Sequence, residues 1–363
     1  MNPIPTDLVL DIFSRLPSKS IVRFRCLSKL WGSKLHHSYF TDFYLIKSST
    51  RPRLLFLLQG NRSLSFFSSP QPQNPYEKSS LVVTAGFRVK IPKDLSMEFI
   101  GYASGLIYFC YTQTSEGYTY KVHLICNPST GQCASLPKLR MPGGSHSFFG
   151  FDPIEKQFKI LSVAEDGHRI LTLGTGEMIW RKIQCPLTHC PYSTRICING
   201  VLYYLAVNDT SELIVCFDVR SEKFKFIEVI EEEECFYYDE LINYKGKLGG
   251  IFMKNDNADR SGIPKLCLWV LEDVEKQKWS KYVHTLRDDK IDNWYYISVV
   301  GMTATGEIVL LKNYKSKPIY VFYFNPVRNT LQSVEIQGFG EYSDANRRSV
   351  SVSIDYVEDL NFF

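Results

Sequence analysis

The stretch that decides the fold is Asn199-Gly-Val-Leu-Tyr-Tyr-Leu205, followed by Val215-Cys-Phe-Asp218 and the turn residues Val219-Arg-Ser221. The first segment is apolar and aromatic and begins with a glycine, and the second ends in an acidic residue followed by a turn. Two such segments in succession are typical of paired β-strands. Further copies of the first type begin at Gly105, Gly246 and Gly306, and further copies of the second end at Asn127, Asp152, Glu272 and Asn325. The chain therefore repeats a pair of strands.

The spacing of these strands predicts the architecture. Gly200 and Gly246 are 46 residues apart, and Gly105 and Gly200 are 95 apart, which is two units of similar length. A repeat of ~45 to 50 residues with four short strands is the period of a propeller blade. Over residues 51–363 we therefore predict an all-β, propeller-like domain of about six or seven four-stranded blades.

The composition supports a folded, sheet-rich protein. Of the 363 residues, 44% are hydrophobic, 22% are charged and 14% are aromatic, which excludes a disordered chain and favours strands. The net charge of +4 is smaller than the strongly positive charge expected of a nucleic-acid-binding protein. We see no signal peptide and no apolar run of membrane-spanning length. We therefore expect a cytoplasmic and/or nuclear protein that is not secreted, with reduced cysteines and no contact with membrane or nucleic acid.

The first fifty residues have a different, helical pattern. Thr6 is a candidate N-cap, and Leu8, Ile12 and Leu16 belong to one apolar stripe that ends at Pro17. Two more short helices are predicted before Phe43-Tyr44, after which the period changes to two. Three helices of this size cannot bury their own apolar faces. They either form a cap packed on the sheet domain or present a surface to a partner.

The residues of this segment resemble the F-box. The similarity covers roughly residues 2–45 and rests on Ile4-Pro5, Leu8, Ile12-Phe13, Leu16-Pro17, Ile21, Phe24-Arg25-Cys26, Ser28-Lys29, Trp31 and Leu35. It implies an F-box helical domain over residues 1–50 that binds the Skp-type adaptor of an SCF (cullin-RING) ubiquitin ligase. The adaptor-binding residues are then expected to be Ile4, Pro5, Leu8, Ile12, Leu16, Pro17, Ile21, Phe24 and Trp31, with Ile21, Phe24 and Trp31 divided between helix packing and the interface. Residues 1–53 carry a net charge of +6, which would attract an acidic adaptor.

The rest of the chain resembles the F-box-associated, kelch-like propeller region of plant F-box proteins. The matching pieces are Cys126-Asn-Pro-Ser-Thr-Gly131, Phe149-Gly-Phe-Asp-Pro153, Trp180-Arg-Lys-Ile183, Ile198-Asn-Gly-Val-Leu-Tyr203 and Trp279-Ser-Lys281. The resemblance implies that this region binds the protein to be ubiquitinated. On the rim loops, Asp292, Trp294 and Tyr295 combine aromatic and acidic side chains as binding hot spots do, and we predict that they contact the target.

Two candidate chemistries are rejected on the sequence. Cys185, His189, Cys190 and Cys197 approach the spacing of a zinc site, but a second paired cluster is missing, so we predict no metal ion and no cofactor. Ser145-His146 lacks the surroundings of a nucleophile. We therefore predict no enzymatic activity.

The sequence thus predicts a substrate-recognition subunit of an SCF ligase, with an unknown target protein. Two alternatives stay open. The propeller could bind a small molecule or glycan, with the F-box coupling it to the ligase, or the chain could bind the adaptor without assembling a ligase.

Overall fold

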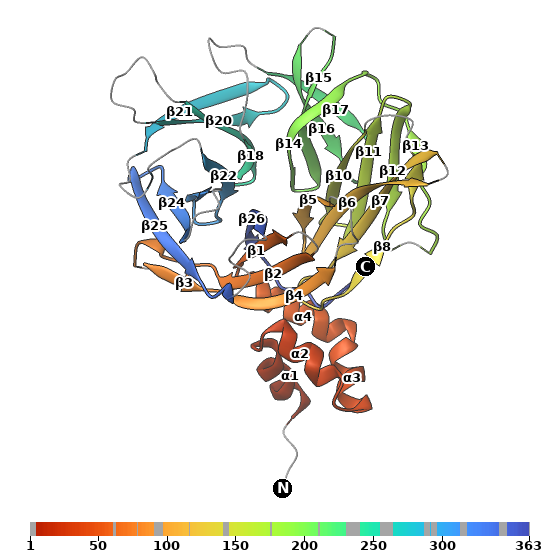
Figure 1. Ribbon diagram of the computed structural model, residues 1–363, viewed down its shortest axis with the longest axis vertical. Coiled ribbons are helices and arrows are strands. Elements are labelled where there is room, and N and C mark those ends of the chain that lie inside the picture. Colours follow the sequence, from red (N-terminus) through yellow and green to blue (C-terminus); the bar gives the residue numbers. More distant parts are fainter. Residues whose placement is uncertain are drawn as a thin grey trace.

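The protein consists of four N-terminal helices followed by a ring of six small antiparallel sheets (Figure 1). The computed structural model describes residues 5–60, 63–77, 79–90, 97–115, 117–140, 145–174, 176–209, 211–229, 240–254, 264–286, 291, 296–312, 318–340 and 347–362. The expected helical start and propeller are confirmed, and the number of blades is six.

The helical unit contains one helix more than the sequence predicted. Its helices are α1 (Thr6–Ser14), α2 (Ser18–Arg25), α3 (Lys29–His36) and α4 (Ser38–Ser49). The helical pattern therefore continues past Tyr44 to Ser49, and the first strand begins at Arg53. Phe40 and Tyr44, four residues apart, are both buried in the helical core. Aromatic and hydroxyl side chains in this segment favour strands locally, and packing against the other helices overrides that preference.

Each blade contains four strands in sequence order from the central channel outward, except where the ring closes. Blade 1 is β26 (Arg347–Tyr356), β1 (Arg53–Gly60), β2 (Ser63–Pro70) and β4 (Thr84–Lys90); blade 2 is β5 (Met97–Ala103), β6 (Leu106–Ser115), β7 (Tyr118–Cys126) and β8 (Cys133–Ser135), with β9 (Leu139–Arg140) also on β7; blade 3 is β10 (Ser145–Asp152), β11 (Gln157–Ala164), β12 (Gly167–Thr172) and β13 (Arg181–Ile183). Blade 4 is β14 (Cys190–Ile198), β15 (Val201–Val207), β16 (Glu212–Asp218) and β17 (Phe224–Glu228); blade 5 is β18 (Glu240–Tyr244), β19 (Lys247–Lys254), β20 (Lys265–Asp273) and β21 (Lys278–Thr285); blade 6 is β22 (Ile297–Met302), β23 (Ile308–Lys312), β24 (Ile319–Asn325) and β25 (Thr330–Gln337), with β3 (Ser80–Val82) parallel to β25.

The repeated sequence pair corresponds to the second and third strands of the blades. Asn199 and Gly200 both have positive φ, as do Ser104 and Gly105, and this is the signature of the type I′ turn that joins a first strand to a second. The segment that ends at Asp152 is an exception, because it forms the first strand, β10, of blade 3. Local turn chemistry therefore explains the glycine-led strands.

The ring is closed by the chain end. β26 pairs antiparallel with β1, so the first blade takes its innermost strand from the last part of the chain. β3 crosses from blade 1 to the outer edge of blade 6. Apolar side chains fill the space between each pair of neighbouring blades, as Phe322 does between blades 5 and 6. No blade could bury both faces alone, and closure gives every blade two neighbours.

The structure contains one disulfide among the described residues, between Cys126 and Cys133. These two residues are direct cross-strand partners on β7 and β8, and their Cα atoms lie 4.2 Å apart. The expectation that all cysteines are reduced is therefore wrong for this pair. Strand pairing, which the sequence did not reveal here, brings the two sulfur atoms together.

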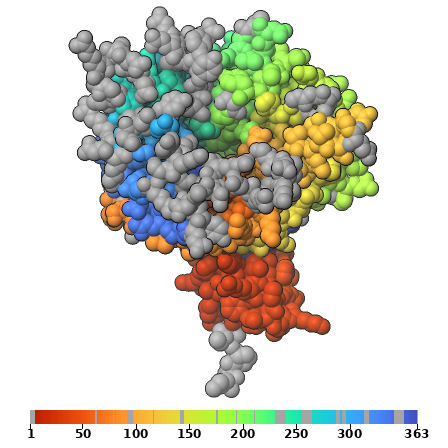
Figure 2. Space-filling view, viewed as in Figure 1, coloured from red at the N-terminus to blue at the C-terminus, as the bar shows by residue number. Residues whose placement is uncertain are grey.

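The helical unit is fixed to the propeller by the segment after β26. Leu360 is buried in the core formed by the helices, and the Glu358 carboxylate accepts hydrogen bonds from Ser18 Oγ (2.7 Å) and Tyr44 Oη (3.3 Å). The Lys19 ammonium donates to the Ala85 carbonyl on blade 1 at 3.3 Å. The helices accordingly project from the ring beside blade 1 (Figures 1 and 2).

An ion pair joins blades 3 and 4, and we expect its removal to lower the stability of the fold. Asp152 is 1% exposed and accepts two hydrogen bonds from the Arg220 guanidinium, each 2.8 Å long. Hydrogen bonding to Arg220 lowers the pKa of Asp152 below its ordinary value. A lowered folded-state pKa stabilises the fold above the unfolded value of about 3.9, and this contribution is lost as the pH falls through the folded value.

Arg220→Met should therefore lower the midpoint of thermal unfolding at pH 7, because it leaves a buried carboxylate without its partner. The difference from the unmodified protein should narrow as the pH falls below about 4, where Asp152 becomes protonated in the variant and in the unfolded chain. Arg328→Met is the matched control, since Arg328 is exposed in the corresponding turn of blade 6. Equal midpoints for the two variants at pH 7 would refute the role of the pair.

Candidate adaptor-binding and target-binding surfaces

One face of α1 presents apolar side chains to solvent. Leu8 and Ile12, four residues apart on the same face, are 54% and 55% exposed, and Pro5 and Pro17 at the helix boundaries are also exposed. Phe13 on the other side of α1 is buried in the helical core. An exposed apolar stripe on a folded helix marks a surface for a partner.

The other residues expected at this surface lie deeper. Leu16, Phe24 and Trp31 are half-buried, and the rings of Phe24 and Trp31 pack on Phe13 with centroid distances of 4.9 and 5.1 Å. Ile21 is fully buried, so its side chain packs within the helical unit. Ile4 lies outside the described residues.

Further apolar side chains of the helical unit are exposed, which the helical periodicity did not predict. Leu27 and Leu30 are 68% and 60% exposed around the turn between α2 and α3, where Ser28 caps α3 by accepting a hydrogen bond from the Trp31 amide. Their exposure could have been predicted from their positions beside Ser28, the N-cap of α3, since residues at a helix start are seldom covered by the helix itself. They are further exposed apolar side chains on the helical unit.

The positive charge of the helical unit remains largely exposed. Arg15 forms an ion pair with Asp11 at 2.8 Å, but Lys19, Arg23 and Lys29 are exposed. Exposed charges of one sign raise the association rate with a partner of opposite sign. These exposed basic side chains are therefore available to attract an acidic adaptor.

The two ends of the propeller carry different turns and connections between strands. In a four-stranded antiparallel blade, the turn between the first and second strands lies at one end. The turn between the second and third strands and the connection between blades both lie at the other end, which we call the loop rim. The predicted target-binding residues Asp292, Trp294 and Tyr295 lie outside the described residues. They belong to the connection between β21 and β22, which starts and finishes at the loop rim.

The opposite mouth of the central channel contains a cavity of about 340 Å³. Innermost strands of several blades line it, and its polar side chains include Asn199, Asn243 and Asp355. Gln71 donates a 2.7 Å hydrogen bond to Asp355, and burial raises the pKa of this carboxyl. The cavity has the size and mixed polarity of a small-molecule site.

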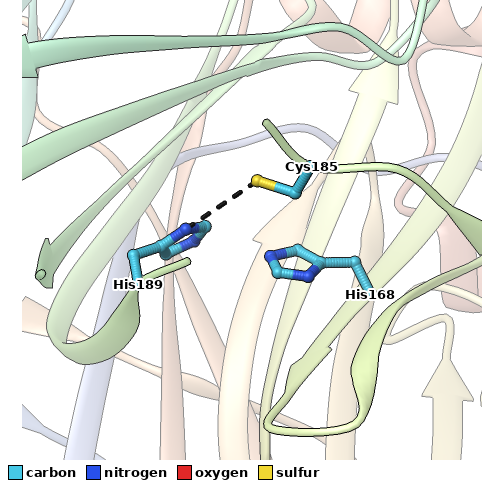
Figure 3. Close-up of side chains that lie close together, drawn as sticks. All are labelled: His168, Cys185 and His189. Atoms are coloured by element: carbon cyan, nitrogen blue, oxygen red, sulfur yellow. Dashed lines mark hydrogen bonds between the residues drawn. The ribbon is translucent and has the colours of Figure 1, made fainter. Parts of the chain in front are cut away.

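The structure revises the candidate zinc ligands. Cys190 is exposed, with Sγ near the Pro191 carbonyl, and Cys197 Sγ lies 3.7 Å from the Phe151 carbonyl oxygen. Neither joins Cys185 and His189. Instead, His168 from β12 completes a group of three whose ligand atoms lie within 4.8 Å of one another (Figure 3). No spacing along the chain pointed to His168, because it reaches the group from the neighbouring strand β12.

Among the described helices, none has the length and apolar character needed to cross a membrane.

Comparison with known proteins identifies the family. A model of the F-box domain matches residues 3–43, and a model of the F-box associated beta propeller domain matches residues 53–357. At5g42430 of Arabidopsis thaliana, which is named as an F-box protein, is 54% identical over 99% of this chain and 92% of its own length. F-box protein At1g67130 and F-box protein At3g57590 from the same plant are 49% and 48% identical, over 100% and 99% of this chain and 80% and 91% of their own lengths. The chain therefore belongs to the plant-type F-box proteins that carry an F-box-associated β-propeller.

Proposed function

We propose that this protein is the substrate-recognition subunit of an SCF (cullin-RING) ubiquitin ligase, acting in the cytoplasm or nucleus. The observation that carries the proposal is the exposed pair Leu8 and Ile12 on a helical unit that Leu360 and Glu358 fix to a propeller. The apolar face of α1, with Pro5 and Pro17 at its ends, binds the Skp-type adaptor. The adaptor connects the chain to the cullin and the RING subunit.

The propeller holds the target protein. Loops on a rigid scaffold carry most recognition, and the loop rim offers the connections between strands of all six blades. Asp292, Trp294 and Tyr295 contribute to this contact. The chain contributes no catalytic group of its own, because transfer of ubiquitin depends on holding the target near the other subunits.

Reconstitution tests this function. The full chain is co-expressed with a Skp-type adaptor and combined with cullin, RING subunit, ubiquitin-conjugating enzyme and ubiquitin. We expect a stable four-subunit complex and ubiquitination of proteins captured by the propeller. Adaptor binding without recruitment of the cullin would instead support an interaction protein outside the ligase.

The cavity of about 340 Å³ at the channel mouth favours one second candidate. In this alternative, a small molecule or glycan binds beside Asn199, Asn243 and Asp355, and the F-box couples its binding to the ligase. A thermal-shift screen of metabolites and oligosaccharides distinguishes the two. A ligand at 100 times its dissociation constant stabilises the fold by about 2.7 kcal/mol. A hit whose stabilisation is lost in Asn243→Ala would support the alternative.

A further inference from the structure

Three potential metal ligands converge where blade 3 meets blade 4. His168 lies on β12, whereas Cys185 and His189 lie on the connection from β13 to β14. One nitrogen or sulfur atom of each lies within 4.8 Å of those of the other two, and Cys185 Sγ is 3.9 Å from His189 Nδ1. Figure 3 shows the two rings and the thiol facing a common space.

The donor set and its spacing suit zinc. Two imidazoles and a thiolate are among the ligands that Zn²⁺ prefers, with Zn–N distances of about 2.0 to 2.1 Å and a Zn–S distance of about 2.3 Å. Tetrahedral geometry then separates a nitrogen ligand from the sulfur by about 3.6 Å. The distance of 3.9 Å between Cys185 and His189 is close to this value. Movements on the order of 1 Å would bring all three ligands to bonding distance.

The surroundings of the two rings also favour an ion. His168 Nε2 is buried and has no hydrogen-bond partner among the described residues, so an ion would satisfy it. His189 Nε2 lies 2.7 Å from Tyr204 Oη, an outer contact of the kind that orients a ligating histidine. Burial lowers the pKa of His168 to about 4 and also lowers that of His189.

Two features oppose binding and must be overcome. Burial raises the pKa of the Cys185 thiol, so coordination would release a proton. His189 Nδ1 also lies 3.0 Å from the Leu187 carbonyl oxygen, and an ion at Nδ1 would replace this contact. Both changes lie within the short connection that carries Cys185 and His189.

We infer that His168, Cys185 and His189 bind a single Zn²⁺ ion whose fourth coordination position faces a cavity of about 500 Å³. The cavity is also lined by His146, Glu165 and Cys190. The ion would tie the connection between blades 3 and 4 to β12 at the loop rim. This inference stands independently of the proposed ligase function.

Cobalt substitution tests the site. The full chain, treated with chelator and dialysed, is titrated with Co²⁺, whose bond to a thiolate gives a charge-transfer absorption that Zn²⁺ then removes by competition. We expect one equivalent of Co²⁺ with this absorption. Cys185→Ser should abolish it. His168→Gln should weaken zinc binding by at least about tenfold, since loss of an outer-shell partner alone costs about 10- to 100-fold.

The matched controls are Cys190→Ser and His146→Gln, which change a thiol and an imidazole lining the same cavity. Both should bind zinc as the unmodified protein does. Zinc should raise the unfolding midpoint of the unmodified protein and of the controls, but not that of Cys185→Ser, whose midpoint in chelator reports whether it folds. Absence of stoichiometric binding, or binding that survives in both Cys185→Ser and His168→Gln, would overturn the inference.

Discussion

Replacing Leu8 and Ile12 together by alanine is expected to weaken binding of a Skp-type adaptor by at least about 100-fold, which corresponds to ~2.7 kcal/mol. Both side chains are more than half exposed on α1, so they contribute little to the stability of the free protein. In the proposed complex they would be desolvated at the centre of the contact, where truncations have their largest effects. Alanine also retains helix propensity. Affinity is measured by calorimetry with the purified adaptor.

The matched control for this pair is the double variant Ile154→Ala and Val327→Ala. These aliphatic side chains are 72% and 88% exposed, but they lie on the propeller. The control should bind the adaptor normally, and both double variants should keep the unfolding midpoint of the unmodified chain. Truncation of Leu16 and Pro17 is a less clean test, because Leu16 packs against the helical core. Unchanged affinity in Leu8→Ala with Ile12→Ala would refute the assigned surface.

Replacing Tyr356 by alanine is expected to lower the free energy of unfolding by about 3 to 5 kcal/mol, as for other large aromatic residues in cores. Tyr356 is buried near the end of β26, the strand that closes the ring. Its ring packs against Tyr102, with a centroid distance of 5.6 Å, and its hydroxyl lies 2.6 Å from Ser129 Oγ on blade 2. The variant would therefore leave a cavity where blades 1 and 2 meet and remove a partner from Ser129. Chemical denaturation followed by tryptophan fluorescence measures the loss.

Two further tyrosine variants separate the causes of this loss. Tyr356→Phe keeps the ring and removes only the hydrogen bond, so it should cost about 1 to 2 kcal/mol. Tyr282→Ala removes a tyrosine that is 41% exposed on the outer strand β21, and it should change stability by less than about 1 kcal/mol. If Tyr356→Ala were as mild as Tyr282→Ala, the closing strand would not depend on this side chain.

Part of the candidate sites was predictable from sequence. The stripe of Leu8, Ile12 and Leu16 follows from helical periodicity, because neighbours on one helix face are set by local geometry. Periodicity cannot say which side chains of a stripe face solvent. Leu8 and Ile12 are exposed, whereas Leu16 is half-buried and Ile21 is fully buried, because the packing of α4 and Leu360 decides which faces are covered.

The candidate zinc site was also only partly predictable from the sequence. Spacing along the chain pointed to Cys185 and His189, which are four residues apart. It also suggested Cys190 and Cys197, which do not belong to the group of three, and it could not indicate His168, which enters from β12. A ligand set assembled across strands depends on sheet pairing and blade packing, and neither is encoded in a local spacing.

The sequence by itself determined the strand pairs, their repeat and the turns that join them, because a type I′ turn at Asn199-Gly200 is a local requirement for positive φ. It also determined the family, through the motifs of the two domains. Only the tertiary structure decided the blade number, the closure of β26 on β1, the helix α4 and the docking of Leu360 among the helices. These features arise from contacts between residues hundreds of positions apart, whose free energy comes from burying shared apolar surface and not from any local preference.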